Sequence, residues 1–339
     1  MTERSIWKIF DMYNYLCGYF RYRWNPVREK IFGKQNWTKI RYCAGKRLIS
    51  RQETNRLIGE ALQKGEPYWV GRMGDTEMKA IYAVLAHRMD VTKDNRVVAT
   101  KQMCTNAGFF PEDVTLCERF VDKMIDACQN IDLQGQWARY MEDYLYVRYQ
   151  KRTVLSHIEY LEPWSMYLCA ESAVKPWSAM LKGKKVLVIH PFADTIYSQY
   201  TKNRTEIFKN IFDADEILPE FELKTLKAVQ TVAGTRDERF ENWFEALEWM
   251  VTECKKIDFD VAIIGCGAYG YLLADRIKKM GKISIHLGGA TQLLFGIIGK
   301  RWEEDNPDFC RRVVNEYWTR PAEHEKVVNM RKIEDGCYW

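Results

Sequence analysis

One short stretch of the chain reads Pro67-Tyr68-Trp69-Val70-Gly71-Arg72-Met73-Gly74-Asp75-Thr76-Glu77. Its first four residues are β-prone, and glycines flank the turn that follows. After the turn, apolar residues have the spacing of one face of a helix, at Met78, Ile81, Tyr82 and Leu85. The stretch therefore predicts a strand, a turn and a helix. In open α/β sheets, ligands bind at the carboxyl ends of such strands.

Two carboxylates stand in this turn, at Asp75 and Glu77. A turning backbone sends residues two apart to the same side, so both side chains could reach one hard cation. Gly74 would let the backbone come close to a ligand, and Arg72 adds a cation suited to phosphate. A structural alternative stays open, in which Asp75 caps the helix and Glu77 compensates its dipole.

The second half of the chain alternates between predicted strands and predicted helices. Buried-type strands are expected at 185–190, 215–218, 259–264 and 282–287, with helices at 193–212, 237–255 and 271–280. Further helices are expected at 114–128 and 136–149. This alternation predicts βαβ units and a doubly wound, mainly parallel sheet of the Rossmann-like α/β class. The loops after these strands should open on the same edge as Asp75.

The loop Gly265-Cys266-Gly267-Ala268-Tyr269-Gly270 has the Gly-x-Gly-x-x-Gly pattern between a predicted strand and a predicted helix. A dinucleotide site also needs an acidic residue at the end of the next strand, which here reads Ile285-His286-Leu287. The loop therefore suits a diphosphate at a helix N-terminus, without the acid that binds the ribose of NAD. Close packing of strand and helix is the alternative.

Other candidate residues stand near predicted strand ends. His190 and Asp194 are candidates for a catalytic base, and His286 lies where it could contact a ligand; either histidine could also be structural. The segment Cys104–Pro111 is predicted to be turn-rich, and its Asn106 could shape a pocket or belong to an ordinary loop. The acids Glu159, Glu162 and Glu171 lie among aromatic residues, which would suit sugar stacking, although they could equally be surface positions.

Composition is that of an ordinary globular protein, with 47% apolar and 29% charged residues. Residues 1–50 carry eleven Lys/Arg and three Asp/Glu, whereas the remainder carries 40 basic and 43 acidic residues (51 − 11 and 46 − 3). This balance argues against a nucleic-acid-binding core. The basic, aromatic segment predicts a helical arm that lies on an anionic membrane surface, or one that packs on its own domain or on a second subunit.

The ten cysteines include no Cys-x-x-Cys pair, and the sequence has no apolar run of 18 residues. These features favour a cytoplasmic protein that contacts a membrane at most peripherally. Three parts are expected: the basic arm at 1–50, a catalytic domain at 51–320 and a tail at 321–339. Whether the chain forms an oligomer is left open.

The hexapeptide Arg72-Met73-Gly74-Asp75-Thr76-Glu77 resembles the Arg-x-Gly-Asp-x-Glu stretch of GT-D-type glycosyltransferases, which are bacterial enzymes of surface polysaccharide and glycoprotein glycan assembly. The similarity extends from about residue 54 to about residue 302 and includes Asn106-Ala107-Gly108-Phe109-Phe110 and the segment 288–302. Thr76 departs from the pattern, because many relatives are expected to have glycine there.

The resemblance implies a metal-dependent hexosyltransferase. Asp75 and Glu77 would hold Mn²⁺ or Mg²⁺ on a nucleotide-sugar donor, with UDP-hexose the expected donor and a glycan or lipid-linked glycan the acceptor. The donor would contact Arg72, Gly74, Asn106, Gly265, Gly267, Tyr269 and His286. Two alternatives remain at this point. One is an NAD(P)-dependent oxidoreductase that uses the Gly265–Gly270 loop, and the other is a non-catalytic scaffold of a glycan assembly complex.

Overall fold

A computed structural model of the chain describes residues 41–90, 93–137, 143–167, 174–211 and 214–327, together with Tyr338 and scattered positions between Met12 and Ile31. The predicted helical arm lies mostly outside the described residues, and so does Glu171. The predicted divisions near residues 50 and 320 stay predictions. None of the helices in the described ranges is long and apolar enough to span a bilayer.

Seven parallel strands form the central sheet, in the order β5-β4-β3-β9-β8-β6-β7. The strands are β3 (Tyr68–Gly71), β4 (Leu133–Gln136), β5 (Val154–His157), β6 (Lys185–His190), β7 (Glu222–Lys227), β8 (Val261–Ile264) and β9 (Ile283–His286). A separate antiparallel pair consists of β1 (Tyr42–Cys43) and β2 (Lys46–Arg47). The predicted doubly wound, mainly parallel α/β fold is confirmed.

Side chains that alternate along the strands build two cores, one on each face of the sheet. In β6, Leu187 and Ile189 belong to one apolar cluster, whereas Val186 and Val188 belong to the other. Each strand of a parallel sheet is covered on both faces, so its inner strands are almost continuously apolar. The helices therefore have to cover both faces of the sheet.

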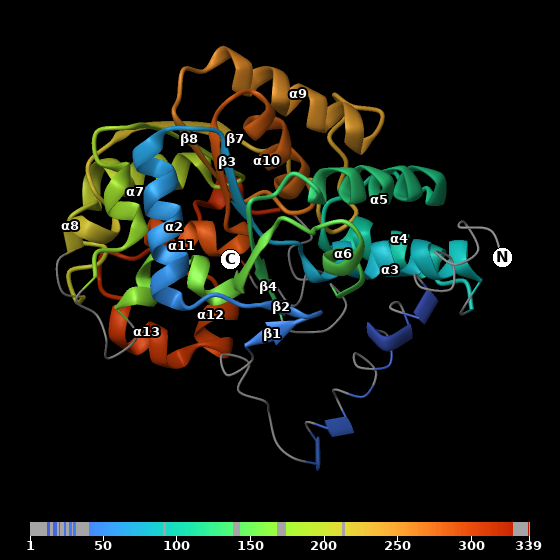
Figure 1. The fold of residues 1–339 in the computed structure, drawn as a ribbon. Helices are drawn as coiled ribbons and strands as arrows, with labels where there is room; N and C mark the ends of the chain where they lie inside the picture. Colours follow the sequence, from blue (N-terminus) through green and yellow to red (C-terminus); the bar gives the residue numbers. More distant parts are fainter. Residues whose placement is uncertain are drawn as a thin grey trace.

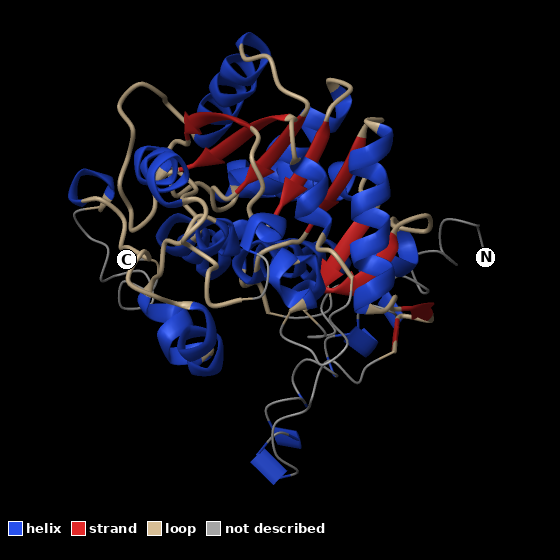
Figure 2. Cartoon of the chain, turned by 90° about the vertical axis from the view of Figure 1, so that its left-hand side faces the viewer, coloured by secondary structure: helices blue, strands red, loops and turns tan. Residues whose placement is uncertain are grey.

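Figures 1 and 2 show these two helical layers with the twisted sheet between them. One layer contains α3 (Asp75–Met89), α4 (Arg96–Asn106), α5 (Val114–Cys128), α6 (Asp143–Arg148), α9 (Trp243–Lys256) and α10 (Tyr269–Lys279). The other contains α2 (Arg51–Lys64), α7 (Ala193–Asn203), α8 (Ala214–Ile217), α11 (Thr291–Leu294), α12 (Lys300–Asp305) and α13 (Pro307–Val313).

The direction in which the chain moves across the sheet reverses between β6 and β8. The connection from β6 to β7 runs through α7 on one face, and the connection from β8 to β9 runs through α10 on the opposite face. Right-handed crossovers in opposite directions leave a crevice outside the carboxyl ends of two such neighbouring strands. The fold thus places a ligand-binding crevice beside His190 and Gly265.

Several predicted elements are wrong in detail. The strand predicted at 215–218 is the short helix α8, and the strand lies a few residues later at β7, an edge strand whose charged residues suit its exposed position. The predicted helix at 136–149 begins too early, because Gln136 ends β4. Cys104–Asn106 belong to α4 rather than to a turn.

Residue Glu325 connects the end of the described chain to α7. Its side chain is 2% exposed and its Oε1 accepts hydrogen bonds from the main-chain N–H groups of Asp194 (2.9 Å) and Thr195 (3.4 Å). The hydroxyl of Thr195 donates to the other carboxylate oxygen. A carboxylate at a helix N-terminus satisfies N–H groups that have no partner within the helix and interacts favourably with the helix dipole.

Replacing this cap should destabilise the fold. We expect Glu325→Ala to lower the free energy of unfolding by about 1–3 kcal/mol, because buried donors at the start of α7 lose their acceptor. Urea denaturation followed by circular dichroism measures the effect. The matched control is Glu323→Ala, whose side chain is 87% exposed and pairs only with Lys326 among the described residues. Equal stability of both variants would contradict the capping role.

Candidate functional site

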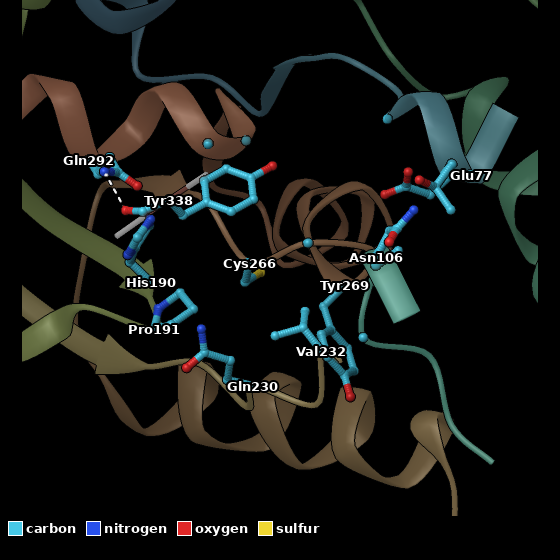
Figure 3. Close-up of a pocket in the computed structure, with 18 of the residues that line it drawn as sticks. Glu77, Asn106, His190, Pro191, Gln230, Val232, Cys266, Tyr269, Gln292 and Tyr338 are labelled. Carbon is cyan, nitrogen blue, oxygen red and sulfur yellow. Dashed lines mark hydrogen bonds between the residues drawn. The ribbon is translucent and has the colours of Figure 1, made fainter. Parts of the chain in front are cut away.

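A cavity of about 360 Å³ opens at the carboxyl edge of the sheet. Its lining includes residues that follow β3, β4, β6, β7, β8 and β9, and the end of α4. Figure 3 shows Glu77 and Asn106 on one side of this cavity and His190 and Gln292 on the opposite side. Of the predicted site residues, the cavity brings together Arg72, Gly74, Asp75, Glu77, Asn106, His190, Gly265, Gly267, Tyr269 and His286, and leaves out Asp194.

The two carboxylates stand in the first turn of α3. Gly74 occupies the N-cap position without a side-chain cap, so Asp75 is the first helical residue and not the cap. The carboxylate of Glu77 bends back over Gly74, where a Cβ atom would collide with it. Asp75 forms an ion pair with Lys79 one turn further on, at 2.6 Å. The turn therefore needs glycine at position 74 to keep Glu77 in the cavity wall.

Glu77 is a buried acid, with 8% of its surface exposed. Burial raises the pKa of Glu77 and Asp75 adds to this effect, while its own main-chain N–H and the charge of Arg72 oppose it. Two carboxylates close together, one of them buried, gain from a cation that compensates their charge. Oxygen ligands of this kind fit a hard divalent ion such as Mg²⁺ or Mn²⁺, which uses one or two carboxylates together with phosphate and water.

Arg72 is held against the wall of the cavity. Its guanidinium lies over the ring of Trp137, 5.0 Å from the centroid, and packs against Gly288. The indole N–H of Trp137 donates to the main-chain oxygen of Met73 at 2.7 Å, which fixes the ring. Burial lowers the pKa of Arg72, an effect that nearby acidic groups such as Glu77 oppose. Arginine retains its charge in proteins, so this side chain is a fixed cation for phosphate.

The glycine loop after β8 has two separate roles. A Cβ atom on Gly265 would lie 2.5 Å from the main-chain oxygen of Gly288, and one on Gly270 would collide with the ring of His286. These two glycines therefore serve close packing, which was the alternative interpretation. The main-chain N–H groups of Cys266 and Gly267 line the cavity at the start of α10 and have no hydrogen-bond partner within the described residues. They can bind an anion.

The ring of His190 lines the cavity and is oriented by the main chain that follows β6. Its Nδ1 accepts the main-chain N–H of Phe192 at 3.0 Å, so in the neutral ring the proton is on Nε2. Burial lowers the pKa of His190 to about 3. The ring nitrogen that is not used within the protein therefore carries a hydrogen and has no lone pair with which to accept a proton.

His286 closes the floor of the cavity at the end of β9. It is 5% exposed and packs on α10 at Gly270, and neither ring nitrogen has a hydrogen bond of good geometry within the described residues. Burial and the charge of Arg72 lower the pKa of His286 to about 3, and an interaction with the main chain of Arg72 opposes them. This ring stays neutral at physiological pH.

Asp194 does not line the cavity and lies in the first turn of α7. Its Oδ2 lies 2.9 Å from Nε2 of His324 and 3.8 Å from Nζ of Lys227. Within the described ranges, Asp194, His324 and Glu325 form a group whose ligand atoms lie within 4.8 Å of one another, which is compatible with a metal ion. Since Glu325 already caps α7, this group also has a structural explanation.

The cavity also contains residues that sequence reasoning did not identify, namely Trp137, Gln230, Thr231, Val232, Gln292 and Tyr338. The residues from Gln230 to Val232 follow β7, so correct placement of that strand would have indicated them. Tyr338 comes from the end of the chain, and its main-chain oxygen accepts a hydrogen bond from Gln292 at 3.3 Å (Figure 3). No pattern in the sequence indicated its position.

Two further residues have clear structural roles at the rim. The ring of Tyr269 stacks on Trp243 with centroids 4.6 Å apart, and its hydroxyl lies 3.1 Å from that of Thr231. Arg301 lines the cavity and donates to the hydroxyl of Tyr338 at 2.9 Å, whereas Lys300 pairs with Glu304 and does not line it. Among the described residues, the positive charge in the lining of this cavity comes from Arg72 and Arg301.

The buried histidines predict a loss of stability in acid. Folding holds the pKa of His286 near 3, whereas in the unfolded chain it is about 6.5. Below pH 6.5 the unfolded chain therefore binds the proton more readily, and the free energy of unfolding decreases as the pH is lowered. Because of this residue, the free energy of unfolding is about 2 kcal/mol lower at pH 5 than at pH 8. Urea denaturation at both pH values should give a smaller difference for His286→Asn than for the wild type. Equal differences would contradict a buried neutral His286.

Comparisons with known proteins agree with this geometry. The sequence model of the GT-D fold-like domain matches residues 49–294, which is most of the chain and includes β3 to β9. Searches of curated proteins and of solved structures found no match. The matched segment contains both carboxylates, Arg72, the glycine loop and His286. The resemblance seen in the hexapeptide at residues 72–77 is thereby confirmed, and the chain belongs to the GT-D-like family.

Proposed function

We propose that the chain is a metal-dependent glycosyltransferase, which transfers a hexose from a nucleoside diphosphate sugar to an acceptor glycan. One observation carries this proposal. Asp75 and Glu77 line the same cavity as Arg72 and as the N–H groups that precede α10. A site with two acids for a cation, and with an arginine and two main-chain N–H groups for phosphates, suits a metal-bound diphosphate. Membership of the GT-D-like family supports a sugar as the group transferred.

Each group would have a separate role in the reaction. Asp75 and Glu77 would hold Mn²⁺ or Mg²⁺, which supplies Lewis-acid stabilisation of the leaving diphosphate when bound. Arg72 and the N–H groups of Cys266 and Gly267 would bind diphosphate oxygens and stabilise the charge that grows on them. The Nε2–H of His190 would donate a hydrogen bond to the donor, in place of the role as base predicted for this residue.

An oxidoreductase is less well supported. The strand after the glycine loop ends in His286, and the residues that follow it are Leu287 and Gly288, so the acid that would bind an NAD ribose is missing. A non-catalytic scaffold would have no need for a buried acid beside a second acid, because such a pair costs stability without a ligand.

The finer assignments also belong to this proposal. We expect UDP-hexose as the donor and a glycan or lipid-linked glycan of surface polysaccharide or glycoprotein assembly as the acceptor. A cytoplasmic location, with peripheral membrane contact through residues 1–50, would suit such an acceptor, because basic residues attract anionic lipids. We expect no nucleic-acid partner.

Removing either acid should abolish transfer without unfolding the protein. We expect Asp75→Asn and Glu77→Gln each to lower the rate by two or more orders of magnitude, on the order of 3 kcal/mol of transition-state stabilisation. Each change keeps the shape of the side chain and removes one charge from the proposed cation site. Release of UDP from UDP-hexoses at saturating Mn²⁺ measures the rate, and thermal unfolding without metal measures stability.

The control is Glu60→Gln, which removes a carboxylate that pairs with Arg56 on the exposed surface of α2. We expect this variant to behave as the wild type in both measurements. The metal assignment is wrong if Glu77→Gln releases UDP at the wild-type rate in saturating Mn²⁺ and donor.

A further inference from the structure

A second cavity of about 320 Å³ adjoins the first one. The two share Arg72, Trp137, Gly289, Arg301 and Asp305, so the two arginines stand between them. The second cavity extends toward the carboxyl ends of β4 and β5, where its own lining includes His157, Glu159, Glu162 and Trp302. A molecule in this cavity would therefore meet one in the first cavity beside Arg72.

The lining of the second cavity suits a sugar. Trp137 and Trp302 present indole rings, whose faces can stack on the C–H groups of a pyranose ring. Carboxylates and histidine provide hydrogen-bond partners for hydroxyl groups. The ring of Trp137 is held by its bond to Met73 and by Arg72, and that of Trp302 lies 6.0 Å from the ring of Tyr338. Such fixed aromatic walls with a few polar groups are typical of small-molecule sites.

Glu162 stands out among these polar groups. It lies directly before the 3₁₀ turn Pro163–Met166, is half-buried and lines this cavity. Burial raises the pKa of Glu162 to about 7, and Glu159 acts in the same direction, while Arg72 and the Trp164 side chain oppose them. A carboxyl of this kind can exchange a proton near neutral pH.

Within the described ranges, the charged and titratable groups that line this cavity beside Glu162 come from four elements. They are Arg72 after β3, His157 at the end of β5, Glu159 in the turn that follows, and Arg301 and Asp305 in α12. The proposed metal pair, Asp75 and Glu77, lines only the first cavity. Glu162 is thus separated from the cation site by Arg72, as a base that acts on the acceptor side of the reaction would have to be.

We propose that the second cavity binds the acceptor sugar and that Glu162 takes the proton from its attacking hydroxyl group. This inference rests on the proposed function. In the transfer step, a bond forms between the acceptor oxygen and the anomeric carbon of the donor, and the bond from that carbon to the phosphate oxygen breaks. The electron pair of the broken bond leaves with the nucleoside diphosphate, and the acceptor proton moves to the Glu162 carboxylate. Water that enters the same cavity would be activated in the same way, which gives slow hydrolysis of the donor.

The test uses the full chain and compares the wild type with Glu162→Gln. The probes are Mn²⁺ with UDP-, dTDP-, GDP- and CDP-hexoses, and the readout is nucleoside diphosphate release between pH 5 and 9. We expect the wild-type rate to fall below an apparent pKa near 7, and the variant to be about 100-fold slower or more and to lack this acid limb. Calorimetric binding of the nucleoside diphosphate with Mn²⁺ should be the same for both proteins.

Glu159→Gln provides the matched comparison, because it removes a neighbouring carboxylate three residues away. Loss of that negative charge should shift the acid limb of the rate to lower pH, which a merely structural Glu162 would not cause. Wild-type rate and pH dependence in Glu162→Gln would overturn the inference and leave the proposed function intact. Absence of nucleotide binding and release in the wild type would instead contradict the proposed function itself.

Discussion

Because all seven strands run in the same direction, every loop at their carboxyl ends opens on one edge of the sheet. The reversal of chain direction between β6 and β8 then leaves a crevice that neighbouring loops cannot fill. Residues from distant parts of the sequence, such as Glu77, His190 and Gly267, meet there for this reason. The site is therefore a consequence of strand direction and topology, while its chemistry depends on the few side chains at the strand ends.

Burial of those charged side chains lowers the stability of the fold. Glu77 is buried close to Asp75, and the Arg72 guanidinium is enclosed between Trp137 and Gly288. Charges that are removed from water lose hydration free energy, which a protein recovers only through partners of opposite charge. A divalent cation and a diphosphate would provide such partners for the acids and for the arginine respectively. The unfavourable burial is thus the physical reason to regard this edge as a binding site and not as a surface feature.

Much of the fold could be predicted from the sequence because the inner strands are short apolar runs between helices with one apolar face. The carboxylate pair, Arg72 and the glycine loop could be identified because their residue types and spacing in the sequence already indicate cation and phosphate binding. β4 was missed because its buried glutamines look polar, and only the structure reveals that Gln134 accepts hydrogen bonds from Gln150 and Tyr271. Such partners are distant in sequence, and so no local pattern reports them.

The role of each site residue was harder to predict than its presence. His190 was expected to be a candidate base, but its tautomer depends on the N–H of Phe192, which is a detail of the backbone. Asp194 was expected in the site, yet the first turn of α7 directs it toward His324. The position of Tyr338 over the cavity depends on chain packing far from the strands. The orientation of these side chains depends on tertiary contacts, and periodicity and spacing in the sequence do not reveal such contacts.

The most direct test of the central claim is a thermal-unfolding screen of the full chain with nucleotide sugars, NAD and NADP, each with and without Mn²⁺. A ligand present at 100 times its Kd stabilises the folded state by about 2.7 kcal/mol, which such a screen detects easily. We predict that a nucleoside diphosphate sugar raises the melting temperature only when Mn²⁺ is present, and that NAD and NADP have no effect. Stabilisation by NAD or NADP without metal, together with none by any nucleotide sugar, would contradict the account.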